Sequence, residues 1–193
     1  RASAGAAARR PATRQQLDIL LSETQLRHGE QRRSGLLLAI TGVVEMGALR
    51  RALQRVVARH SALRTRFERT ADGRLMQRVD ASQSTPAVPL RIVNARGRQA
   101  SLDASLAKHV ASCTFDLMTG PLLSALLVRM SPGDHVLSVG VHHAIFDNWS
   151  ADIFRSELAA AYAAGAAAAQ SGGAAQPANA AQPAGAAMPA GAG

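Results

Sequence analysis

The sequence predicts an α/β domain in which helices pack on a mixed sheet. Apolar positions at helical spacing over residues 46–60 predict an amphipathic helix with arginines on its outer face. The apolar run 36–40 predicts a buried strand, and the run 135–141 predicts a second strand. Because strand and helix patterns alternate over residues 17–162, we expect one layered structure there.

Turn residues and shorter apolar patterns define the remaining elements. Asp72-Gly73 between two strand-like runs is typical of a hairpin, and Ser131 to Asp134 is typical of a turn between two strands. Ser101 is a candidate helix N-cap. The apolar face of the last helix is expected to contain Trp149, Ile153, Phe154, Leu158 and Tyr162. The predicted strands are 64–69, 75–79, 90–93, 122–130 and 135–142, and the other predicted helices are 22–30, one after Ser101, and 150–162.

Composition marks the boundaries of the folded body. Residues 1–13 are expected to form an N-terminal linker, and residues 14–164 the domain itself. From residue 165 the chain is Ala, Gly, Pro, Gln, Ser and Asn with one Met, so it cannot bury enough side chain to offset its ordering entropy. Residues 165–193 are therefore expected to be a disordered linker, although Ala-rich sequence can extend the last helix past Tyr162.

Charge and cysteine usage narrow the function classes. The net charge is +9, but the arginines are scattered and no DNA-binding motif accompanies them, so nucleic acid is not the expected partner. A basic surface instead suits an acidic protein partner. Cys113 is the only cysteine, which excludes an internal disulfide and fits the cytoplasm, and it is expected to be a small core residue. No stretch is long and apolar enough for a membrane span.

The candidate site is the stretch 141–150, which joins a strand to a helix. Successive strand side chains point to opposite faces, so His142 and His143 should diverge, with only one of them facing a substrate. Imidazole suits general-base chemistry near neutral pH. Asp147 at the helix start could bind a nearby Arg or cap the helix. A metal site is not expected, because adjacent strand residues point apart.

Four stretches, in order, carry a resemblance to a known family. They are HHAIFDNWS at 142–150, RHSALRTRF at 59–67, FDLMTGPLL at 115–123 and, more weakly, SETQLR at 22–27. Together they resemble the motifs of condensation domains of nonribosomal peptide synthetases, which belong to the chloramphenicol-acetyltransferase-like superfamily. The family usually has Gly where this chain has Asn148, a residue that tolerates left-handed backbone angles. The matched segment covers only the first of the family's two similar halves.

The resemblance implies amide formation between carrier-bound substrates in secondary-metabolite, often antibiotic, biosynthesis. An acyl or peptidyl thioester would be attacked by the amino group of an aminoacyl thioester. The phosphopantetheine arms belong to upstream and downstream carrier proteins, so no cofactor is expected in this chain. By the family pattern His143 is catalytic, while His142, Asp147 and Arg64 are structural, with Arg64 the candidate partner of Asp147. The C-terminal subdomain would be a further partner.

Two other functions agree with these motifs. Related two-His acyltransferases make esters, and epimerisation domains share the two-His motif. A heterocyclisation domain is disfavoured, because its first motif His is replaced by Asp and His142 stands here. The alternative of another class is a half-domain that only docks carrier proteins, without catalysis.

Overall fold

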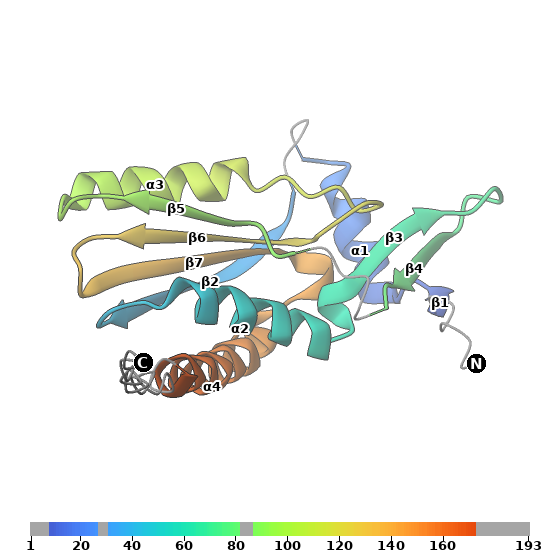
Figure 1. The fold of residues 1–193 in the computed structure, drawn as a ribbon. Coiled ribbons are helices and arrows are strands. Elements are labelled where there is room, and N and C mark those ends of the chain that lie inside the picture. The colour runs from blue at the N-terminus through green and yellow to red at the C-terminus, as the bar shows by residue number, and fades with distance from the viewer. Residues whose placement is uncertain (1–7, 27–30, 82–86, 173–193) are drawn as a thin grey trace, which may run out of the picture.

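A computed structural model describes residues 8–26, 31–81 and 87–172, arranged in two sheets and four α-helices (Figure 1). In chain order the elements are β1 (Ala8–Pro11), α1 (Arg14–Glu23), β2 (Arg33–Thr41), α2 (Met46–Arg59), η1 (Ala62–Arg64), β3 (Thr65–Arg69), β4 (Leu75–Val79), β5 (Leu90–Asn94), α3 (Gln99–Ser112), β6 (Leu123–Arg129), β7 (Asp134–His142), η3 (His143–Ile145) and α4 (Asn148–Gly172). None of the described helices is long and apolar enough to cross a bilayer.

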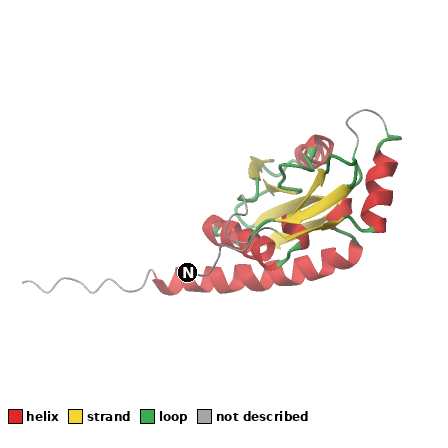
Figure 2. Ribbon diagram, turned by 90° about the vertical axis from the view of Figure 1, so that its right-hand side faces the viewer, coloured by secondary structure: helices red, strands yellow, loops and turns green. Residues whose placement is uncertain are grey.

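The main sheet is mixed, as the sequence predicts. Its order is β2-β7-β6-β5, with β5 and β6 parallel and the other pairs antiparallel. Helices α2 and α4 pack together on one face, and α3 covers the other, so the sheet lies between helices (Figure 2). The core on the α2 and α4 side includes Leu53, Leu127, Leu137 and Phe154, all almost fully buried. Strand β7 is central, so its carboxyl end has a fixed position.

The second sheet, β1-β4-β3, contains the predicted hairpin and one strand that was not predicted. Strands β3 and β4 pair antiparallel on either side of the Asp72-Gly73 turn, where Gly73 has a positive φ of 82°. Residues 8–11 of the predicted linker form β1, which pairs with the edge of β4. A four-residue edge strand carries too short a pattern to be seen in sequence, and its Pro11 is tolerated at an edge.

The first helix lies earlier in the chain than predicted. It begins after Thr13, whose side chain forms a reciprocal capping box with Gln16, and it ends at Glu23. The prediction of a helix at 22–30 is therefore wrong for residues 24–26, and residues 27–30 lie outside the described part of the chain. Similarly, α3 begins at Gln99 with Arg98 as N-cap residue, so Ser101 lies inside the helix and does not cap it.

Two predictions of burial also need correction. Strand β2 is at the edge of its sheet, and Leu37 is 60% exposed, so the apolar run 36–40 is buried on one face only. In α4, Phe154 and Leu158 are buried on the apolar face as predicted, whereas Trp149 is 79% exposed and Ile153 is 42% exposed. The helix also continues to Gly172, into the predicted linker, and residues 173–193 lie outside the described residues.

Candidate active site

Both motif histidines are fixed through their main chain at the end of β7. The His142 N–H donates to the carbonyl of Leu122 at 3.0 Å, and the His143 N–H donates to the carbonyl of Arg32 at 2.8 Å. The strand ends at His142, and the chain turns at once into η3. This turn sends the two imidazoles into different surroundings.

The His142 side chain is completely buried and faces α1. Its ring meets Phe115 edge-on with centroids 6.2 Å apart, and its Nε2 lies 3.2 Å from Oε1 of Glu23, close but poorly aligned for a hydrogen bond. Its Nδ1 accepts the N–H of Ala144 at 3.2 Å, so the proton of the neutral ring is on Nε2. Burial lowers the pKa of His142, and the Glu23 carboxylate opposes this only in part. Burial therefore disfavours the charged form of His142, and its Nδ1 is already bonded.

The His143 ring has the opposite arrangement. Its Nδ1 lies 2.8 Å from the carbonyl oxygen of Phe146. A carbonyl oxygen can only accept, so Nδ1 carries the proton and Nε2 keeps a lone pair. No other described residue hydrogen-bonds to Nε2. His143 is half-buried and lines a pocket, so it can present an accepting nitrogen to a bound molecule.

The Asp147 carboxylate caps α4. Its Oδ1 accepts the Ser150 N–H at 2.8 Å and the Ser150 hydroxyl at 2.7 Å. These hydrogen bonds, that of the hydroxyl first, lower the pKa of Asp147. Of the two roles that the sequence allowed, the structure has the helix cap.

The expected ion pair between Asp147 and Arg64 is not formed in the described part of the chain. The guanidinium of Arg64 donates instead to the backbone carbonyl of Asp80, and its Nε is buried without a partner. Asp80 also pairs with Arg66. Arg64 therefore ties η1 to the end of β4, and it does not line the pocket that contains His143.

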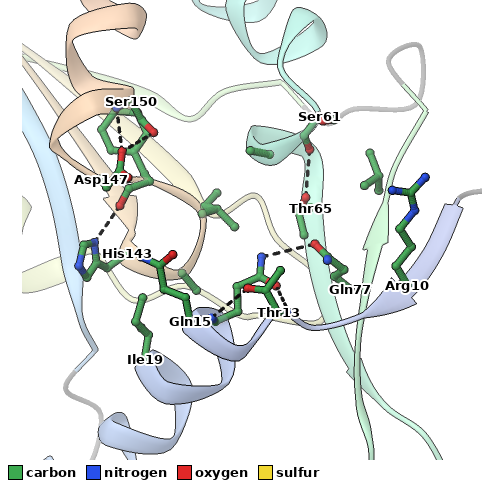
Figure 3. Close-up of a pocket in the computed structure, with 16 residues that line it drawn as sticks. Arg10, Thr13, Gln15, Ile19, Ser61, Thr65, Gln77, His143, Asp147 and Ser150 are labelled. Atoms are coloured by element: carbon green, nitrogen blue, oxygen red, sulfur yellow. Dashed lines mark hydrogen bonds between the residues drawn. The ribbon is translucent and has the colours of Figure 1, made fainter.

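The pocket in front of His143 has a volume of about 510 Å³ and is built from four separate segments. Figure 3 shows His143, Asp147 and Ser150 on one side, with Gln77 and Arg10 on the other. The start of α1 supplies the wall between them, and the Gln16 side chain donates to that of Gln77 across it at 3.4 Å. Such a pocket falls in the size range of small-molecule sites.

Sequence reasoning missed the α1 and β1 part of this site. Glu23, which faces His142, and the pocket residues Arg10, Thr13 and Gln16 come from segments more than a hundred residues away from the motif. Only the weak SETQLR match pointed there. Cys113 is buried, as expected, with Sγ 3.0 Å from the Ser124 hydroxyl. The described residues contain no group of three or more acidic, His or Cys side chains placed to hold a metal ion.

Comparison with protein families supplies the deciding observation. The family model described as Condensation domain matches residues 11–173. The chain belongs to this family. Its condensation-domain fold is also that of the starter condensation domain of rhizomide synthetase RzmA, with a TM-score of 0.72 over 83% of this chain and 39% of that one at 22% identity.

Two further relatives are similar in sequence. The chain is 40% identical over 123 residues to the cyclosporin synthetase of Tolypocladium inflatum, which covers 64% of this chain and 1% of that protein. It is 33% identical to the X-domain from teicoplanin biosynthesis, with a TM-score of 0.72 over 86% of this chain and 35% of that one. The chain thus spans a small part of the curated synthetases that it matches, and less than half of these solved domains.

The departure from the family motif at Asn148 leaves the backbone unstrained. Asn148 is the first residue of α4. The only described non-glycine residue with a positive φ is Arg96, so Asn148 does not need the left-handed conformation that the sequence allowed for. This condensation domain therefore accommodates Asn at the position usually held by Gly.

Proposed function

We propose that this chain is the N-terminal, two-His half of a condensation domain that joins an acyl or peptidyl thioester to an aminoacyl thioester. The observation that carries the proposal is the state of the His143 ring: Nδ1 is bonded to the Phe146 carbonyl, and Nε2 is the nitrogen left to accept a proton. His142 lacks such a nitrogen, because Nδ1 is already bonded and the ring is fully buried.

In the proposed reaction the acceptor amine donates an N–H to Nε2 of His143 while its lone pair attacks the thioester carbon. The C–N bond forms, the C–S bond breaks, and the proton lost by the amine ends on the departing thiol. His143 thus holds the amine in attacking geometry or accepts its proton. Buried His142 and the helix cap at Asp147 keep η3, and therefore the His143 ring, in place. Arg64 supports the η1 wall beside them.

The proposed partners are the upstream and downstream carrier proteins, which bring the substrates on phosphopantetheine arms, and a C-terminal subdomain that closes the site. Correct positioning of two reactants is worth about 7–11 kcal/mol of barrier. We therefore expect the isolated chain to have little or no condensation activity.

The experiment supplies loaded donor and acceptor carrier proteins to the 193-residue chain alone and to the same chain joined to a condensation C-terminal subdomain. Condensed product, measured by mass spectrometry, is expected only from the joined protein and is expected to be lost in its His143→Ala variant. Turnover by the isolated chain that depends on His143 would overturn the half-domain proposal. An ester product from a hydroxyl acceptor would identify the ester-forming alternative, and inversion of a bound peptidyl thioester would identify epimerisation.

The second candidate function is docking without catalysis. The observation that favours it is the 33% identity to the teicoplanin X-domain, which has been solved in complex with OxyB. The exposed Trp149 and Ile153 offer apolar surface for a protein partner. Carrier-protein binding by the joined protein, without product and without any effect of His143→Ala, would select this candidate over condensation.

A further inference from the structure

A second pocket lies at the opposite end of β7 from the motif histidines. It has a volume of about 490 Å³ and is formed where β6 turns into β7, at the left end of the sheet in Figure 1. His135 is seven residues before His142 on the same strand, which places the two about 23 Å apart. This pocket is therefore separate from the proposed catalytic centre.

Sheet register places polar and basic side chains side by side at this end. Asn94 of β5 is the register partner of Arg129 of β6, and Arg129 is the partner of His135 of β7. Register partners project on the same face of a sheet, so these three form one row. The Ala95 N–H donates to the carbonyl of Arg129 at 2.8 Å and keeps the following residue, Arg96, beside the row. Asn94, Arg96, Arg129 and His135 all line the pocket.

The positive charges of this pocket are not neutralised within the described residues. Neither the Arg96 nor the Arg129 side chain makes an ion pair or side-chain hydrogen bond with any other described residue, and no carboxylate lines the pocket. The nearest acidic groups along the chain have other partners. Asp134 accepts the hydroxyl of Ser131 at 2.8 Å, and Glu45 caps α2. Two unpaired guanidinium groups in one concave site favour an anion.

His135 gives an independent indication that the pocket has an occupant. It is only 6% exposed, and both of its ring nitrogens are buried without a hydrogen-bond partner. A buried polar group without a partner destabilises a fold, and native structures seldom keep one that has no role. An oxygen atom that reaches the floor of the pocket would supply the partner that this ring lacks.

We propose that this pocket binds an oxyanion, a carboxylate or phosphate, carried on an apolar chain. Arg96 and Arg129 hold the charge, and the imidazole of His135 forms the polar floor. The rest of the lining is mostly apolar and suits the apolar part of the ligand, because it consists of Val43, Val44, Met130 and Pro132 together with Ser131. Val43 is 87% exposed, so its side chain is free to contact such a ligand.

The test measures binding of octanoate and octyl phosphate to the 193-residue chain by calorimetry, with octanol and acetate as probes that lack the charge or the chain. Both octyl anions are expected to bind, and octanol and acetate much more weakly; the tighter of the two anions identifies the headgroup. Arg129→Gln and Arg96→Gln are each expected to weaken binding about 10- to 100-fold, whereas Arg50→Gln, on the exposed face of α2, leaves it unchanged. Equal loss in all three variants, or equal binding of octanol, would overturn the proposal.

A second variant separates binding from folding. His135→Leu removes the unpartnered nitrogens and keeps apolar volume, so we expect its melting temperature to equal or exceed that of the parent chain while octyl-anion affinity falls. If His135→Leu melts no lower and binds the anions as tightly as the parent, the imidazole has no part in the site and the proposed pocket chemistry is wrong.

Discussion

Replacing His142 by Ala should cost far more folding stability than replacing its neighbour His143. The His142 ring is fully buried against Phe115, and its removal leaves a cavity and an unpaired Ala144 N–H. The Glu23 carboxylate loses its imidazole neighbour and keeps the hydrogen bond that it accepts from the Arg32 N–H. Truncation of a large buried ring costs about 3–5 kcal/mol. Loss of the hydrogen bond from the Ala144 N–H accounts for about 1 kcal/mol, as part of this cost or in addition to it. Domains of this size have about 5–15 kcal/mol in total, so His142→Ala should be close to unfolding.

His143→Ala should behave differently, because the ring is half-buried and makes one hydrogen bond, to the Phe146 carbonyl. We expect a loss of about 1 kcal/mol. The assay is urea unfolding of both variants and the parent chain, followed by far-UV circular dichroism, with the slope m compared to verify that the same transition is measured. Equal losses in the two variants, or a larger loss for His143→Ala, would refute the division of roles that the structure gives these residues.

Three further predictions concern the buried histidines, the cap of α4 and the edge strand β2. Burial lowers the pKa of His142 and of His109, a buried residue of α3. The unfolded chain therefore binds protons more readily, and the free energy of unfolding should fall as the pH drops below about 6.5. A rise in this free energy on acidification, measured by chemical denaturation, would contradict this. Asp147→Ala should lose the cap of α4 and about 0.5–2 kcal/mol, with Asp147→Asn retaining most of it, and equal melting temperatures for parent and Asp147→Ala would show that the cap is dispensable. Leu37→Thr should leave stability within about 0.5 kcal/mol, because the side chain lies outward on an edge strand, and a loss of 2 kcal/mol in urea unfolding would mean that this face is covered.

The elements that were predicted correctly from the sequence have either a long apolar pattern or turn residues within one short stretch of the chain. Helix α2 has fourteen residues with a continuous apolar face. The ring of its C-cap residue, His60, lies 2.8 Å from the Glu157 carboxylate of α4. The β3–β4 hairpin and the β6–β7 pair each have their turn residues in the sequence itself. In these cases local preference and the final fold agree.

The elements that sequence missed depend on contacts between distant segments. Strand β1 exists because β4 offers it an edge some seventy residues later. The exposure of Leu37 follows from the edge position of β2, which the chain's own apolar run does not encode. Arg64 was expected to meet Asp147, but its guanidinium donates to the Asp80 carbonyl at the end of β4, and Asp147 accepts from Ser150.

At the candidate site, the sequence predicted that the two histidines diverge, and they do so for a different reason. The expected cause was strand alternation, whereas the strand ends at His142 and the turn into η3 reorients His143. The buried carboxylate partner of His142 could not be foreseen, since nothing local links Glu23 to the motif.

The central claim, that His143 and not His142 offers a free basic nitrogen, is tested most directly by the tautomers of the two rings. Long-range ¹H–¹⁵N correlation spectra of the ¹⁵N-labelled chain at about pH 8, where imidazoles as a class are neutral, report which ring nitrogen carries the proton. The structure predicts the proton on Nδ1 of His143 and on Nε2 of His142. A spectrum with the proton on Nε2 of His143 would remove the accepting nitrogen from the pocket and contradict the account.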